Sequence, residues 1–232
     1  MYSARVLISK SRSEDVLQTN QEGIMLSIAI FPCLFTGAAG IVGELSTALN
    51  LKVYTDAMIL ADMKKYYDIP VKDLDGILFG RLKKNSIAHI EKENYAKLLQ
   101  HYLQYLQKKR NRNSLHYGLH TSLLTAHNGK IVKILITDTF AGRQQRGIKF
   151  EGLSEEEAAI CIKRYDKKAH RWTQFLFQKA PYDESLYDLV LQNKKGDSTD
   201  ITNKIRSFCK NWTYRNQTLP QPRLMAQSAL FL

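Results

Sequence analysis

The chain has 232 residues and a mass of 26.7 kDa, which is long enough for one large domain with a buried core. Apolar residues make up 44% and charged residues 24%, and this balance excludes a disordered chain. The three cysteines are far apart and odd in number, which excludes a disulfide framework. We therefore expect a protein of a reducing compartment, the cytoplasm.

The net charge of +12 is distributed unevenly. Residues 1–80 carry 7 Lys and Arg against 9 Asp and Glu, whereas residues 81–232 carry 27 against 13. This pattern is compatible with a solvated basic surface. It is equally compatible with a site that binds phosphates or nucleic acid.

No charged residue occurs between positions 23 and 43, and a stretch of this length can cross a bilayer. A membrane span or a signal peptide is therefore one interpretation. Pro32 and the small residues from Gly37 to Gly40 interrupt the stretch and argue against it. A buried strand that leads into a glycine loop explains the same residues, and we expect no stable membrane insertion.

The first half of the chain predicts alternating strands and helices. Residues 1–22 are interpreted as an N-terminal extension. An Ile- and Leu-rich strand is expected next, followed by a small-residue turn and a helix, over residues 25–34, 36–43 and 43–49. A second strand and helix follow over 51–55 and 56–67, and Pro70 ends that helix.

The second half continues the alternation. Apolar residues at helical spacing predict a long helix over 86–109, and β-branched residues predict a strand over 130–138. Ser154 and Glu157 form a capping-box signature, which opens a helix to about residue 178. A strand over 186–191 and a helix over 200–210 complete one α/β domain, residues 23–210, with a parallel sheet. Residues 211–232 are interpreted as a tail.

The loop from Gly37 to Gly43, between a buried strand and a helix, is the first candidate site. Such a loop can direct backbone N–H groups at an anion beside the helix N-terminus. The Lys of a complete phosphate-loop signature is missing, and Glu44 follows Gly43. A tight strand-to-helix turn explains the loop equally well.

A basic segment that follows the 130–138 strand is the second candidate. Lys163, Lys167 and Arg171 are spaced four apart and share one helix face. Arg143 and Arg146 precede them, and arginine forks suit bidentate phosphate contacts. A solvated basic face is the alternative.

His116 and His120 are spaced four apart, as in some helical metal sites. Gly118 lies between them, and no carboxylate or cysteine joins them at ligand spacing. We therefore expect no metal site here.

The stretch KILITDTFAGRQQRGIKFEGLSEEEAAICIKRYDKKAHRWTQFLF, with SLYDLVL after it, resembles the cytidylate kinase-like proteins of bacteria. These are a branch of the P-loop nucleoside-monophosphate kinases. The likeness covers about residues 25–210 and is most specific over 131–192. It implies a three-layer P-loop NTPase-like fold, in which helices flank a parallel sheet and a helical region serves as a lid.

The resemblance implies phosphoryl transfer from ATP, with Mg²⁺, to CMP, dCMP or a related nucleotide. It assigns lid or catalytic roles to Arg143, Arg164, Asp166 and Arg171, with Lys163 as a further lid cation. It assigns acceptor binding to Thr55, Asp56 and Gly118, and places Asp56 near the acceptor or the metal. The donor phosphates would contact the loop residues Gly37, Ala38, Ala39, Gly40, Ile41, Val42 and Gly43.

The chain departs from the family pattern at three positions. The loop lacks its Lys, Leu60 stands where better-known cytidylate kinases have an Arg, and no Arg occurs around Gly118. Loss of such cations removes transition-state stabilisation. Three hypotheses therefore stay open: a kinase, a nucleotide-binding domain without turnover, and a basic protein of nucleic acid or membrane surfaces. The position of the basic segment favours a small nucleotide over nucleic acid as the partner.

Overall fold

The computed structural model describes residues 27–218, apart from residues 71, 81–86, 110–112, 125–130 and 195. The extension predicted for residues 1–22 and most of the tail predicted for residues 211–232 lie outside this part of the chain.

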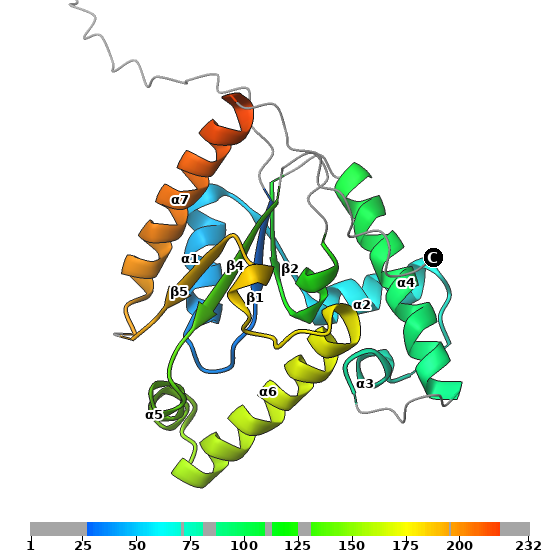
Figure 1. Cartoon of the computed structure of the whole chain (residues 1–232), viewed down its shortest axis with the longest axis horizontal. Coiled ribbons are helices and arrows are strands. Elements are labelled where there is room, and N and C mark those ends of the chain that lie inside the picture. The colour runs from blue at the N-terminus through cyan, green and yellow to red at the C-terminus, as the bar shows by residue number, and fades with distance from the viewer. Residues whose placement is uncertain are drawn as a thin grey trace, which may run out of the picture.

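Five strands form one sheet in the order β2-β3-β1-β4-β5, and every neighbouring pair is parallel (Figure 1). The central strand β1 pairs with β3 on one side and β4 on the other, with Ile28 opposite Leu115 and Val132. The strands are β1 (Ser27–Phe31), β2 (Lys52–Thr55), β3 (Ser114–Tyr117), β4 (Ile131–Thr137) and β5 (Leu189–Gln192).

Helices connect the strands, as parallel pairing requires. The α-helices are α1 (Ala38–Leu49), α2 (Asp56–Tyr66), α3 (Leu74–Phe79), α4 (Ile87–Lys109), α5 (Phe140–Glu151), α6 (Glu155–Phe177) and α7 (Ser198–Thr218). Two short 3₁₀ turns, η1 (Leu119–Leu123) and η3 (Glu184–Leu186), follow β3 and α6.

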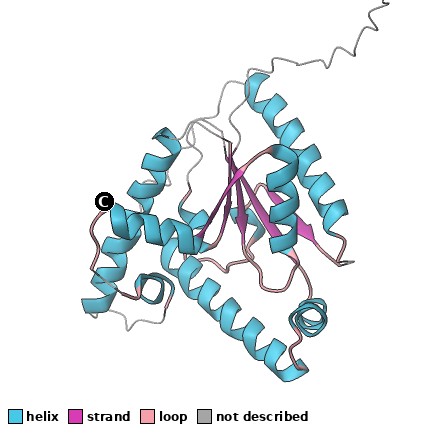
Figure 2. Ribbon diagram, turned by 180° about the vertical axis from the view of Figure 1, so that it is seen from behind, coloured by secondary structure: helices cyan, strands magenta, loops and turns pink. Residues whose placement is uncertain are grey.

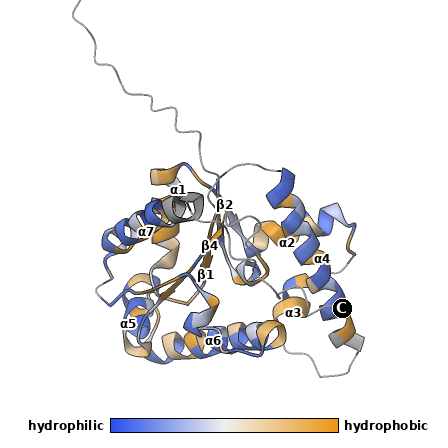
Figure 3. Cartoon of the chain, turned by 45° about the horizontal axis from the view of Figure 1, so that its top comes forward, coloured by the Kyte–Doolittle hydropathy of each residue, from blue (hydrophilic) through white to orange (hydrophobic). Residues whose placement is uncertain are grey.

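The sheet is covered on both faces, which makes three layers (Figure 2). Alternate residues of β1 point to opposite faces. Ile28 and Ile30 belong to a core cluster with α1 and α7, whereas Ala29 and Phe31 belong to one with α2, α3, α4 and α6. Figure 3 shows the apolar strands between these two groups of helices. The prediction of a three-layer parallel α/β sheet is confirmed.

Two helices were not predicted, α3 and α5, and α7 continues eight residues beyond the predicted end at residue 210. The reason is clearest for α5. Its buried residues are Arg143 and Gly147, so the helix has no apolar stripe from which to recognise it. Its start is instead stabilised by Thr139, whose side chain accepts a hydrogen bond from Gly142 N–H.

The uncharged stretch 23–43 forms, from residue 27 onward, strand β1, a loop and the start of α1. The strand-and-loop interpretation of this stretch is therefore correct for its described residues. None of the helices within the described ranges combines the length and the apolarity that crossing a bilayer requires.

Candidate functional site

The candidate site lies at the carboxyl edge of the sheet, where ligands bind in open α/β folds. The segment 32–37 leaves β1 at this edge, and Gly118 follows β3 there. Asp138 follows β4, and Asn193 follows β5. The topology therefore brings together the glycine loop, the predicted acceptor residues Thr55, Asp56 and Gly118 (the acceptor segment) and the start of α5.

Three consecutive carbonyl groups of the loop after β1 accept hydrogen bonds from distant side chains. Arg143 Nε donates to the Leu34 carbonyl at 2.7 Å, and Arg146 Nε donates to the Phe35 carbonyl at 2.9 Å. Asn193 Nδ2 donates to the Thr36 carbonyl at 2.8 Å. In a trans peptide the carbonyl and the next N–H point in opposite directions. The N–H groups of residues 35, 36 and 37 therefore point away from these three side chains.

The backbone of this loop alternates in the sign of φ. Phe35 has φ 59° and Gly37 has φ 79°, whereas Thr36 is not among the residues with positive φ. Alternation of this kind forms concavities of N–H groups that bind anions. A left-handed Phe is strained by about 1–2 kcal/mol, and such strain is concentrated at functional sites. The ring of Phe35 packs against Gly147, where an added Cβ would lie 2.9 Å from it.

The loop is shorter than we predicted, because α1 begins at Ala38 and not at Gly43. Ala38, Ile41, Val42 and Leu45 are buried at helical spacing, and their packing against the sheet extends the helix through Gly40 and Gly43. Of the predicted donor-loop residues, only Gly37 precedes the helix, as its N-cap. Ala38–Gly43 form the first turns, whose leading N–H groups have no intrahelical acceptor.

Glu44, which the sequence places where it would repel a phosphate, is held by α7. Its carboxylate accepts a hydrogen bond from Thr202 Oγ1 at 2.8 Å and another from Ser198 Oγ. The acidic side chain therefore joins α1 to α7.

Arg143 and Asp166, which the family pattern assigns to the lid, bind each other. Arg143 Nη1 and Nη2 donate to the two carboxylate oxygens at 3.0 and 2.8 Å, and Tyr182 Oη donates to Asp166 at 2.6 Å. Arg143 is only 4% exposed. Burial lowers the pKa of Arg143, but the hydrogen bonds to Asp166 outweigh it and raise the pKa. The guanidinium thus joins α5, α6 and the loop.

Arg146 makes a second connection of this kind. It donates to Asp138 and to the Asn193 carbonyl, in addition to the Phe35 carbonyl. Asn193 is 3% exposed and is a site residue that the sequence analysis missed. The only sequence signal for Asn193 is its position: it is a polar residue shortly after a predicted strand, at the edge of the sheet where ligands bind.

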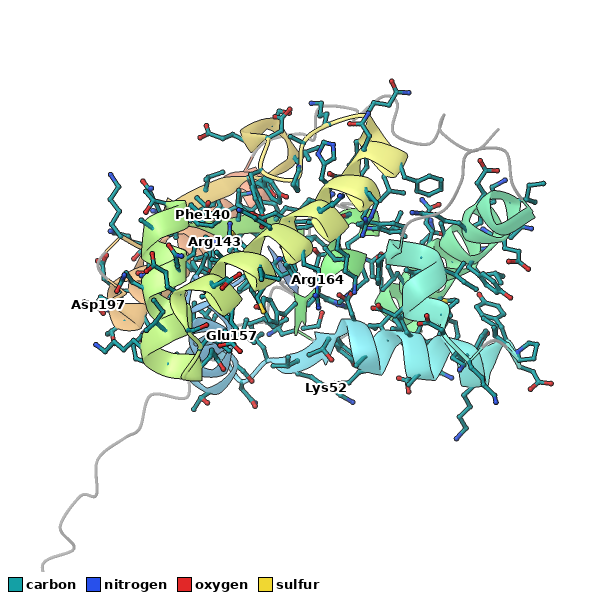
Figure 4. All side chains as sticks on the ribbon, turned by 90° about the horizontal axis from the view of Figure 1, so that it is seen from below. Lys52, Phe140, Arg143, Glu157, Arg164 and Asp197 are labelled. Carbon is teal, nitrogen blue, oxygen red and sulfur yellow. The ribbon has the colours of Figure 1, made fainter. Side chains whose placement is uncertain are left out.

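Arg164 and Arg171 are not part of this network. Figure 4 shows Arg164 on α6, away from Arg143 on α5. Arg164 and Lys163 are exposed on α6, whereas Arg171 is half-buried near the other end of that helix. The structure therefore separates the predicted lid cations into two groups.

The predicted acceptor residues Thr55, Asp56 and Gly118 do lie together. Thr55 caps α2, and its side chain accepts a hydrogen bond from Met58 N–H at 3.4 Å. The Asp56 carboxylate accepts from Leu119 N–H and His120 N–H at 2.8 and 2.9 Å. Gly118 leaves room for it, because a Cβ there would lie 2.4 Å from Asp56 Oδ1.

Asp56 also begins a buried polar chain that sequence reasoning did not predict. His120 Nδ1 lies 2.6 Å from Asp56, His120 Nε2 lies 3.2 Å from His116 Nδ1, and His116 Nε2 lies 3.2 Å from Ser114 Oγ. Burial and the neighbouring His120 lower the pKa of His116 to about 3, so His116 is neutral. The two histidines thus have hydrogen-bonding roles in the core.

The carboxylates at this edge supply no ligand set for magnesium. Asp56 is held by His120, Asp138 by Arg146 and Asp166 by Arg143. Within the described ranges no group of three or more His, Cys, Asp or Glu side chains has the arrangement of a metal site. Mg²⁺ usually retains several waters and binds substrate phosphates, and does not require a cage made only of protein side chains.

The comparisons with known proteins agree with this architecture. A model of the cytidylate kinase-like family matches residues 28–195. The chain belongs to the cytidylate kinase-like family. The match covers all five strands, the loop after β1 and the acceptor segment. No curated protein matches the chain in a sequence search.

Solved structures resemble the chain at low sequence identity. A crystal structure of an uncharacterized protein from Eubacterium ventriosum superposes with a TM-score of 0.63 at 16% identity, and covers 81% of this chain and 99% of its own. Shikimate kinase from Bacteroides thetaiotaomicron has a TM-score of 0.47 at 9% identity, with 80% and 98% covered. Dephospho-CoA kinase from Campylobacter jejuni has a TM-score of 0.41 at 16% identity, with 80% and 97% covered.

Proposed function

We propose that this family member transfers the terminal phosphoryl group of ATP to a nucleoside monophosphate of the CMP or dCMP class. One observation carries the proposal. The carbonyls of residues 34–36 are held by Arg143, Arg146 and Asn193, so the following N–H groups face the opposite side of the loop, next to the N-terminus of α1. This is the arrangement that a donor phosphate requires.

In this proposal the donor phosphates contact the loop after β1 and the exposed residues Gly37, Ala39 and Gly40 at the start of α1, whereas Ala38, Ile41 and Val42 are buried against the sheet. No atom lies within 4 Å of a Cβ added at Gly40 or Gly43, so neither glycine is required by packing within the protein. Thr55, Asp56 and Gly118 line the acceptor side, and Arg143 with Asp166 fixes the loop from the other side. When bound, ATP supplies the phosphoryl group and Mg²⁺ screens its charge.

Coupled ADP release by the purified full chain tests the proposal, with CMP, dCMP, UMP, AMP and GMP as acceptors. Turnover with CMP or dCMP above the ATP-only background is the expected result. No turnover with any acceptor, on protein shown to be folded by its thermal transition, contradicts it.

A second candidate is a nucleotide-binding domain without turnover. It is favoured because Arg143 and Arg146 are engaged by protein carboxylates and carbonyls, and because no Lys follows the loop glycines. In such a protein Arg143 and Arg146 are not free to stabilise the transferring phosphoryl group. Calorimetric titration separates the candidates: binding of ATP or CTP without ADP release supports the second, and absence of any binding contradicts both.

A further inference from the structure

Lys92 of α4 is a buried cation with no carboxylate partner in the described part of the chain. It is 4% exposed, and its Nζ lies 4.8 Å from the ring centroid of Phe175 and 5.7 Å from that of Trp172. Buried lysines are almost always paired. Two cation–π contacts stabilise an ammonium by less than its removal from water costs. The contacts observed therefore do not compensate for the buried charge.

Arg171 of α6, the residue before Trp172, is a second cation near Lys92. Its Nε is buried and has no hydrogen-bond partner within the described residues. Burial, and then the charge of Arg171, lowers the pKa of Lys92 to about 8, so the amine is still mostly protonated at neutral pH. A buried ammonium and a half-buried guanidinium thus lie close enough for the charge of one to affect the other.

No salt bridge joins Lys92 or Arg171 to an acid within the described residues. Asp75 of α3 is paired with α6 through Lys168, whose Nζ lies 2.8 Å from its carboxylate. The internal segments without a described structure, 81–86, 110–112 and 125–130, contain no Asp or Glu, and the acids outside the described ranges are Glu14, Asp15 and Glu22 near the start of the chain. Among the described residues the charge is therefore left for a bound anion to neutralise.

The pair adjoins the candidate acceptor segment. Trp172 Nε1 donates to the Leu119 carbonyl at 2.9 Å, and the N–H of the same Leu119 donates to Asp56. The aromatic ring that borders Lys92 is thus connected through one residue to the turn after β3. The rings of Phe79 and Trp172 pack edge to face, with their centroids 4.8 Å apart.

We propose that Lys92 and Arg171 form a binding site for a compact oxyanion, between α4 and α6, which takes the charged group of the acceptor. The designation as the acceptor's group rests on the proposed kinase function, whereas the anion site itself does not. The ammonium is a point donor, the guanidinium is a planar fork, and the surrounding rings exclude water. Phosphate and carboxylate share the chemistry that these two groups recognise, and the experiment distinguishes them.

The test measures the thermal midpoint of the full chain in sodium phosphate or sodium acetate, against sodium chloride at equal ionic strength. Phosphate is expected to raise the midpoint, and Lys92→Gln and Arg171→Gln are expected to abolish most of that rise. Lys108→Gln on α4 and Arg206→Gln on α7 are exposed controls that should retain it. A rise with acetate and not phosphate assigns the site to a carboxylate. No rise with either anion overturns the proposal.

A second measurement remains informative if Lys92→Gln does not fold. Lys92→Met keeps an apolar side chain against Trp172 and Phe175 and removes only the charge. We expect CMP binding by calorimetry to weaken at least tenfold in Lys92→Met and not in Lys108→Gln. A phosphate effect that persists in both Lys92 variants overturns the site. Unchanged CMP affinity, with the phosphate effect lost, overturns only its assignment to the acceptor. An intact phosphate effect without ADP release instead contradicts the kinase function alone.

Discussion

His120 and Asp56 form a short contact of the acceptor segment, 2.6 Å between Nδ1 and Oδ1. An ionised carboxylate only accepts hydrogen bonds, so Nδ1 carries the hydrogen, an assignment made from the network. The same carboxylate accepts two backbone N–H groups of η1. The side chain that family resemblance assigns to the acceptor therefore also fixes the turn between β3 and η1.

Replacement of this carboxylate should destabilise the fold. In Asp56→Asn the amide group opposes one of three donors, and hydrogen bonds to charged groups contribute about 1.5–3 kcal/mol. We expect urea unfolding to show a loss of about 2 kcal/mol. Asp62→Asn, an exposed position on the same helix, should change stability by less than about 0.5 kcal/mol. Equal effects of the two variants would show that Asp56 is not a structural anchor.

The contribution of Asp56 should also depend on pH. Burial raises the pKa of Asp56, but the hydrogen bonds and charge of His120 and the backbone N–H groups lower it below the usual 3.8. A depressed carboxyl pKa stabilises the fold above the unfolded pKa, and this contribution disappears as the pH falls through the folded pKa. The stability difference between wild type and Asp56→Asn should be constant from pH 5 to 7 and shrink below about pH 4. A difference that grows on acidification would contradict the assignment.

Two glycines should respond to alanine in opposite ways. At Gly118 a Cβ would meet Asp56 at 2.4 Å, so Gly118→Ala should destabilise by about 3 kcal/mol or more. At Gly40, inside α1, a Cβ meets nothing, so Gly40→Ala should stabilise by about 0.5–1 kcal/mol. Thermal unfolding measures both. If Gly40→Ala stabilises the protein while nucleotide affinity falls, the glycine is retained for ligand access. Stabilisation with unchanged affinity argues against a donor loop at α1.

The fold was predictable because its signals are local. The apolar strands β1 and β4 and the capping box of α6 are each visible within about ten residues of sequence. Helix α5 was not predictable from periodicity, because its buried face consists of Arg143 and Gly147. Their burial depends on Asp166 and on the ring of Phe35, both far along the chain.

The sequence and the family resemblance name the candidate site residues but not the contacts that these residues make. Family resemblance selected Arg143 and Asp166, yet no sequence pattern indicates that these two neutralise each other. The glycines predict a loop as far as Gly43, whereas the buried spacing of Ile41, Val42 and Leu45 places these residues in a helix. Asn193 and Lys92 matter through neighbours that only the tertiary structure brings together.

The Arg143–Asp166 pair should show strong energetic coupling. Removal of one partner of a largely buried pair costs about 3–5 kcal/mol, because the other charge is left uncompensated. We expect Arg143→Gln to lose about 3 kcal/mol, and a double-mutant cycle with Asp166→Asn to give a coupling of about 1–3 kcal/mol. The exposed pair Lys204–Asp200 on α7 is the control and should couple by less than about 0.5 kcal/mol. Similar coupling in both pairs would contradict the anchoring role of Arg143.

Lys92 should make stability rise with pH in the alkaline range. Its pKa is about 8 in the folded state, against 10.5 ordinarily, chiefly because of burial. Between these values the unfolded chain binds more protons than the folded one, so the free energy of unfolding increases with pH. Lys92→Met removes this group, and should be more stable than wild type at pH 7, with a difference that shrinks toward pH 10. Urea titrations over this range measure it, with Lys108→Met as the exposed control. A pH-independent difference would show that the pKa of Lys92 is the same in the folded and unfolded states. Burial would then not destabilise the charged form of Lys92.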